Sequence, residues 1–186
     1  MTIEEIYSEL SAHMIKGLMV HDQMANYYCF LNLKGYAKCH TYHYLCENKD
    51  YMELNHYYHR HHNKLIKDKP VTDPKIIPNS WYAYVRADVD ATTKRNAVKT
   101  GLEKWIDWEE ETLQLYSKMY KELFTLGAIA DAKYLECLIT DVNDELAQAN
   151  SLYIKKKSTD FDIESIMGDQ EEKAEKYWQK ITEIWR

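Results

Sequence analysis

Residues 67–94 read KDKPVTDPKIIPNSWYAYVRADVDATTK and contain all three prolines of the 186-residue chain. Proline lacks a backbone N–H and interrupts helices, so this stretch cannot form one long straight helix. We interpret residues 67–93 as a connection between two pairs of helices. Within it, Asn79 or Ser80 can cap a short helical turn that carries Trp81, whose ring is expected to seal the connection against the core.

Apolar residues recur at spacings of three and four on both sides of this connection, which is typical of amphipathic helices. The spacing predicts helices over residues 3–33 and 36–66, with Gly35 as the break, and over 94–126 and 128–156, with Gly127 as the break. A shorter helix over residues 169–185 carries an aromatic face. This face includes Tyr177, Trp178 and Trp185, and it either docks on the bundle or contacts a second copy.

The composition favours one all-α domain over residues 1–186. Glycine is scarce at five residues, tyrosine is abundant at 16, and 29% of residues are charged. The formal net charge of −6 argues against a basic surface that binds the nucleic-acid backbone. No apolar run approaches the roughly 20 residues of a membrane span. We therefore expect a cytoplasmic protein with four reduced cysteines and with no direct nucleic-acid or membrane partner.

Polar residues interrupt the apolar stripe of every long predicted helix. They are His21 in the first helix, His40, His43 and Glu47 in the second with Asp50 at the edge, Glu109 in the third and Glu145 in the fourth. A buried carboxylate without a partner is strongly disfavoured, so these groups need a common explanation. At a rise of about 1.5 Å per residue, His21 and Glu47 both lie roughly 18 Å from the first turn, and Glu109 and Glu145 fall near the same level.

The order of two hairpins joined by one long crossover resembles the ferritin-like four-helix-bundle superfamily over residues 3–156. This resemblance rests on topology and on the inward polar residues. It implies a metal-binding bundle, with iron or manganese redox chemistry or storage as the function. The predicted ligands are His21, His43, Glu47, Glu109 and Glu145, and carboxylates with imidazoles suit iron, manganese or zinc.

The chain departs from the family pattern in three places. His21 stands where the family usually has Glu, His43 and Glu47 reverse the order of the Glu-x-x-His motif, and the helix over residues 128–156 has no histidine. These departures favour a single-metal or zinc site over oxygen activation. A literal Glu-x-x-His at Glu53 and His56 should face solvent, because it lies far around the helix from the apolar stripe.

Three other interpretations of the polar residues remain open. Glu109 and His43 can form a buried polar network without metal. Cys39, His43 and Cys46 share one helix face and offer a rival zinc site, with Cys29 or His21 as a fourth ligand. The histidine-rich sequence HYYHRHH, residues 56–62, is expected to lie in water, where His59 and His62 suit the negative end of a helix.

Two functions from different classes follow from these observations. The first is a metal-binding, ferritin-like protein. The second is a non-enzymatic protein-binding module or inhibitor, for example an anti-CRISPR-like nuclease inhibitor, with structural zinc or no metal. The tyrosines and tryptophans favour a protein partner or self-association. No phosphate-binding loop, dinucleotide fingerprint or nucleophile elbow is present, so enzymatic activity is left undecided.

Overall fold

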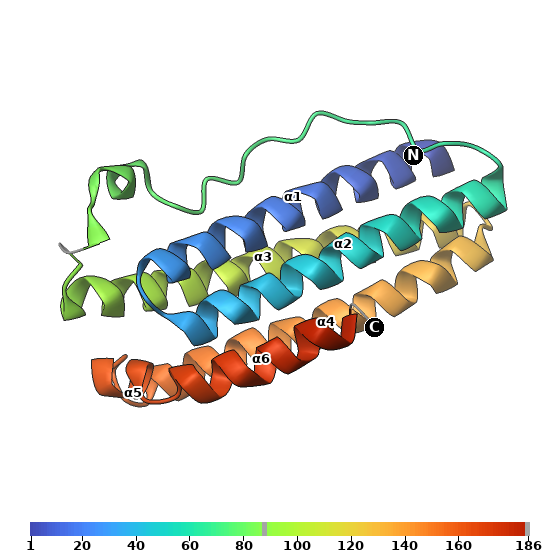
Figure 1. Cartoon of the computed structure of the whole chain (residues 1–186). Coiled ribbons are helices and arrows are strands. Elements are labelled where there is room, and N and C mark those ends of the chain that lie inside the picture. The colour runs from blue at the N-terminus through green and yellow to red at the C-terminus, as the bar shows by residue number, and fades with distance from the viewer. Residues whose placement is uncertain (87–88, 185–186) are drawn as a thin grey trace.

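Four long helices run side by side along the length of the molecule (Figure 1). They are α1 (Ile3–Phe30), α2 (Lys34–His62), α3 (Ala91–Thr125) and α4 (Ile129–Lys157). The computed structural model describes residues 1–86 and 89–184, and this part of the chain contains no strand. α1 packs against α2 and α3 against α4, as two antiparallel pairs. The predicted all-α bundle with one long crossover is confirmed.

The turn between α1 and α2 lies ahead of Gly35, which corrects the predicted break. Asn32 adopts a positive φ of 59° in this turn. Gly35 is buried inside α2, where an added Cβ atom would lie 2.8 Å from the Cβ of Lys173. Lys173 belongs to α6 (Gln170–Ile184). The glycine is therefore required by the close approach of a distant helix and not by the turn.

α2 ends four residues earlier than the predicted position 66. Asn63 follows it in the left-handed conformation, and Leu65, which lies inside the predicted helix 36–66, is 81% exposed. His59 is exposed as expected, but His62 differs because its Nε2 lies 2.7 Å from Oδ1 of Asp131. Asp131 is buried in the first turn of α4 and requires such hydrogen-bond donors.

The crossover returns along α1 to the end of the bundle where the α1/α2 turn lies (Figure 1). Its described residues include the short helical segment η1 (Asn79–Ala83). The Trp81 ring packs edge-on against Tyr27 of α1, with 4.9 Å between the ring centroids. Ala87 and Asp88 of the predicted connection lie outside the described residues. Because the crossover runs back along α1, α3 starts beside the end of α1 that leads into α2 (Figure 1).

Two further helices follow α4. A short helix that was not predicted, α5 (Ile163–Met167), precedes α6, and α6 packs along α2. α6 buries Tyr177 and Ile181 but leaves Trp178 48% exposed. Trp185 of the predicted aromatic face lies outside the described residues. The middle of that face thus docks on the bundle.

The apolar core consists of two clusters with polar side chains between them. One cluster contains Val20, Met24 and Trp105, and the other contains Met14 and Tyr116. The buried His21 lies between Met14 and Met24 along α1, and its place in the core separates the two clusters. No described helix is long and apolar enough to cross a membrane.

Candidate metal centre

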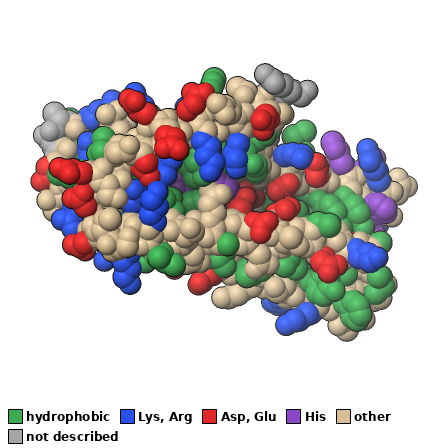
Figure 2. Space-filling model, turned by 90° about the horizontal axis from the view of Figure 1, so that it is seen from below, with side chains coloured by type: hydrophobic (Ala, Val, Ile, Leu, Met, Phe, Trp, Pro, Cys, Tyr) green, Lys and Arg blue, Asp and Glu red, His purple; other side chains and the backbone are tan. Residues whose placement is uncertain are grey.

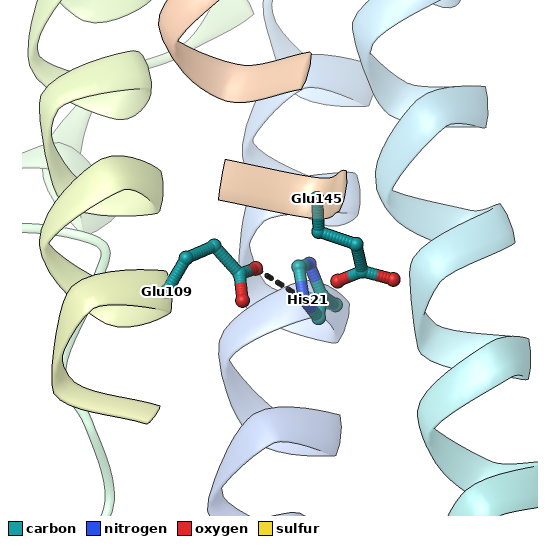
Figure 3. Close-up of side chains that lie close together, drawn as sticks. All are labelled: His21, Glu109 and Glu145. Atoms are coloured by element: carbon teal, nitrogen blue, oxygen red, sulfur yellow. Dashed lines mark ion pairs between the residues drawn. The ribbon is translucent and has the colours of Figure 1, made fainter. Parts of the chain in front are cut away.

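Three side chains from three helices converge between the two apolar clusters of the core (Figure 3). His21 of α1, Glu109 of α3 and Glu145 of α4 each offer a ligand atom, and these atoms all lie within 4.8 Å of one another. His21 Nε2 lies 3.8 Å from Glu109 Oε1. The side chains of His21 and Glu109 are 0% and 1% exposed, and that of Glu145 is 23% exposed. His21 and Glu109 are therefore shielded from water, while Glu145 is partly exposed.

His43 brings the fourth long helix, α2, to the same place. Its Nδ1 lies 3.1 Å from Glu145 Oε1, and the side chain is 2% exposed. Burial disfavours the imidazolium form, yet the carboxylate of Glu145 outweighs burial and raises the pKa of His43 well above its usual value. His43 reciprocally lowers the pKa of Glu145 despite burial. These two groups form a buried ion pair.

Glu109 is held in a different electrostatic environment. Burial, together with the charge of Glu145, raises the pKa of Glu109 to about 8. The indole Nε1 of Trp105 donates a hydrogen bond of 2.8 Å to Glu109 Oε1 and fixes the carboxyl group toward His21. Glu109 is thus a proton-bearing carboxyl group at neutral pH, and a cation can displace that proton.

Glu47 of α2 lies beside His21, Glu109 and Glu145, but it is not one of the three residues whose ligand atoms lie within 4.8 Å of one another. Burial raises the pKa of Glu47 well above its usual value, and the charges of Glu145 and Glu109 add to this rise. Gly17 of α1 makes room for the side chain, because an added Cβ would lie 2.8 Å from Glu47 Oε1. Burial therefore favours the protonated form of Glu47, which lies against α1 at Gly17.

The structure also places His40 against the centre, although the predicted ligand set omits it. His40 is 0% exposed, and its Nδ1 lies 3.1 Å from Nδ1 of His21. One of the two rings must donate a proton in this contact and the other must accept it. If His21 donates, its Nε2 presents a lone pair toward Glu109. The position of His40 on the inner stripe of α2 was the signal that could have identified it.

Several buried nitrogen atoms at this level lack a hydrogen-bond partner. They are Nε2 of His21, Nε2 of His40 and Nδ1 of His43, whose close approach to Glu145 lacks hydrogen-bond alignment. Buried polar atoms normally find a partner in protein or water. Of the three unpartnered nitrogen atoms, Nε2 of His21 lies beside Glu109 and Nδ1 of His43 lies beside Glu145, an arrangement that a cation would satisfy.

The rival ligand sets are not assembled. Glu53 and His56 are exposed, as expected for a Glu-x-x-His sequence on the outer face of α2. Cys39 is buried, whereas Cys29 is exposed. In residues 1–86 and 89–184, no cysteine joins two other ligand atoms within 4.8 Å. The cysteine-based zinc site proposed from the spacing of Cys39, His43 and Cys46 is therefore not formed.

Comparison with known proteins identifies the architecture. The sequence matches no protein-family model and no curated protein. An engineered closed form of the Archaeoglobus fulgidus ferritin superposes with a TM-score of 0.76, at 14% identity, over 94% of this chain and 96% of that chain. The fold is ferritin-like. An open-pore ferritin from the same hyperthermophilic archaeon gives a TM-score of 0.75 and 15% identity, over 92% of this chain and 94% of that chain.

The ferritin-like fold was predicted from the crossover and from the inward polar residues. Identity near 15% establishes the fold alone and assigns no ligand. The assignment of His21, His43, Glu47, Glu109 and Glu145 as metal ligands therefore rests on the geometry of this chain. The structure brings His21, Glu109 and Glu145 together, sets His43 against Glu145, and places Glu47 at the margin.

Proposed function

We propose that this chain binds a transition-metal ion inside its ferritin-like bundle, with iron as the first ion to test and manganese and zinc as the alternatives. One observation carries the proposal: His21, Glu109 and Glu145 point ligand atoms at a common buried position from three helices. His43 supplies a second imidazole from the remaining long helix.

The spacing of these atoms fits one ion. Nitrogen and oxygen ligands at about 2.0–2.2 Å from an ion lie at most about 4.4 Å apart. The three atoms lie within 4.8 Å of one another, so side-chain movements of a few tenths of an ångström suffice. Buried helices hold the donors near these positions, which keeps the reorganisation on binding small.

The charges at the centre also fit a cation. Glu109, Glu145 and Glu47 place three carboxyl groups in a buried volume, where burial first and the charge of Glu145 second raise the pKa values of Glu109 and Glu47. A divalent ion replaces the protons that these groups hold and turns mutual repulsion into attraction. Trp105 keeps the carboxyl group of Glu109 oriented through its hydrogen bond, in the manner of outer partners of metal ligands.

The mixture of imidazole and carboxylate ligands is compatible with iron, manganese and zinc. The two solved structures of similar fold are named as ferritins, which supports iron as the first choice. Bound iron would supply one-electron redox chemistry for oxidation or storage, whereas bound zinc would be a fixed cation without redox chemistry. The identity of the ion therefore decides between a redox or storage protein and a structural metal site.

Metal analysis of protein purified without a histidine tag tests the proposal. Protein loaded anaerobically with Fe(II), or with Mn(II) or Zn(II), and then desalted should retain at least one ion per chain. Glu109→Ala and His21→Gln should lose that ion, whereas the control His56→Gln changes an exposed histidine and should retain it. Absence of any retained ion in the unaltered protein, or full retention by Glu109→Ala, would refute the proposal.

A further inference from the structure

A polar cleft of about 460 Å³ opens at the surface beside the candidate centre. Its inner end is formed by His43 of α2 and Glu145 of α4, and its walls carry Asp50, Asp141 and Asp144. Lys180, near the end of α6, lies at its rim. The same face of the molecule shows acidic side chains around a hollow near its middle (Figure 2). The cleft therefore joins solvent to the ligand set.

The helix packing explains why the bundle opens on this side. α1 packs with α2, α3 packs with α4, and α6 packs along α2, whereas direct packing between α2 and α4 is not extensive. Trp105 and Trp108 of α3 belong to one apolar cluster of the core, and Met14 and Tyr116 belong to the other. The residues that line the cleft come from α2, α4 and α6, so the polar approach to the centre lies between α2 and α4.

An unpartnered imidazole nitrogen lies at the inner end of this cleft. His43 lines the cleft although its side chain is only 2% exposed, and its Nδ1 makes no hydrogen bond. This atom lies 3.1 Å from Glu145 Oε1 without a hydrogen bond to it, so the inner end offers an imidazole nitrogen and a carboxylate oxygen to the same ligand. Glu145 beside it also belongs to the three closest ligand atoms of the centre.

The two lysines of the cleft only partly offset its four carboxylates. Lys49 lies 3.7 Å from Glu53, an exposed residue that does not line the cleft. Lys180 lies over the ring of Tyr42, 4.9 Å from its centroid. His43 and Glu145 pair with each other, and the three aspartates that remain exceed the two lysines by one formal negative charge. A net negative cleft raises the local concentration of cations.

We propose that hydrated divalent cations reach the centre through this cleft between α2 and α4. The inference rests on the proposed metal-binding function. At about 30 Å³ per water molecule, the cleft has room for an ion with its hydration shell. Asp50 and Asp141 attract the hydrated ion at the walls, and His43 and Glu145 replace part of its water at the inner end. Asp50 and Asp141 therefore control the rate of loading, while the buried ligands control the affinity.

Stopped-flow loading with Co(II) tests the role of the acidic walls. Quenching of the tryptophan fluorescence reports arrival at the centre, because Trp105 is hydrogen-bonded to Glu109. The double variant Asp50→Asn/Asp141→Asn should load at least about fivefold more slowly than the unaltered protein in low salt. Its final stoichiometry should be unchanged. The control Glu136→Gln/Glu172→Gln removes two exposed charges from α4 and α6, outside the cleft, and should load at the normal rate.

Cys46 provides a second test, because its thiol lines the same cleft. In a Cys29→Ser/Cys137→Ser background, which removes the two exposed cysteines, a maleimide should modify Cys46 ahead of the buried Cys39. Modified protein should load Co(II) at least about tenfold more slowly, because the adduct occupies the approach to His43. Mass spectrometry after proteolysis confirms the modified residue.

The outcomes separate this inference from the proposed function. Normal loading rates in both the double aspartate variant and the Cys46 adduct, with a full complement of bound ion, would overturn the access route and leave the metal centre standing. Failure of the unaltered protein to bind Co(II), Fe(II), Mn(II) or Zn(II) would overturn both. Slow loading of the two altered proteins with normal final stoichiometry would establish the route.

Discussion

Glu109→Gln should make the metal-free protein more stable at neutral and alkaline pH while it abolishes ion binding. Glutamine retains the size of glutamate and an oxygen that accepts the hydrogen bond from Trp105. It cannot ionise. The substitution therefore separates the charge of residue 109 from its packing, which an alanine at this position does not.

The magnitude follows from the titration of Glu109. Burial and the charge of Glu145 raise its pKa to about 8 from the ordinary value of 4.5. An acid with a raised pKa in the folded state holds its proton after the unfolded chain has released it, so stability is full below about pH 4.5 and falls as pH rises toward 8. Since one pKa unit corresponds to about 1.4 kcal/mol, the loss attributable to Glu109 between pH 5 and pH 8 is roughly 3 kcal/mol.

Urea unfolding in EDTA, followed by circular dichroism at pH 5 and pH 8, measures this difference. The stability of Glu109→Gln relative to the unaltered protein should increase by roughly 3 kcal/mol between the two pH values. Glu110→Gln on the same helix changes an exposed carboxylate and should show no such increase. Titration with Co(II) or Mn(II) should find no high-affinity site in Glu109→Gln. Destabilisation at pH 8, or ion binding at the normal stoichiometry, would refute the reasoning.

Three further substitutions test the packing and the histidines. Gly101→Ala should lower the free energy of unfolding by about 1–3 kcal/mol, measured by urea, because its Cβ would lie 2.1 Å from the hydroxyl of Tyr28. Tyr177→Phe removes the acceptor of a 2.9 Å hydrogen bond from Gln148, and calorimetry should show about 1 kcal/mol lower stability. Burial lowers the pKa of His21 to about 3, so below pH 6.5 the unfolded chain binds a proton that the folded chain does not. The free energy of unfolding therefore falls by about 1.4 kcal/mol per pH unit below pH 6.5. His21→Gln should therefore make acid unfolding less steep between pH 6 and pH 4; an unchanged profile would contradict a neutral buried His21.

The convergence of His21, Glu109 and Glu145 could be predicted because long helices are rigid rods. Residue spacing gives both the face and the height of each side chain, and the crossover fixes which ends lie together. The prediction required no knowledge of loops beyond their lengths. It was less accurate for Glu47, whose place depends on the close approach of α1 at Gly17, a contact that helical periodicity does not specify.

Other features depend on contacts between residues far apart in the sequence. Gly35 looked like a helix break, yet it allows the backbone of α2 to approach Gln170 and Lys173 at the start of α6. The contact of His40 with His21 depends on how far α2 is rotated about its own axis. An apolar stripe specifies that rotation only to within a fraction of a turn, which is too coarse to predict the contact. The cleft at the centre depends on the separation of α2 from α4 and on the position of α6, and neither has a local sequence signal.

Stability alone does not account for the polar layer. A buried ion pair such as His43–Glu145 is often no more stabilising than apolar side chains of similar volume, and Glu109 and Glu47 oppose folding wherever their protons must be lost. Leucine at these positions would join the two apolar clusters into one continuous core. The layer is also placed where a polar cleft reaches it from solvent, which a purely structural network does not require. The proposed cation would account for both the unfavourable burial and the access, because it would stabilise the charges only after it has arrived.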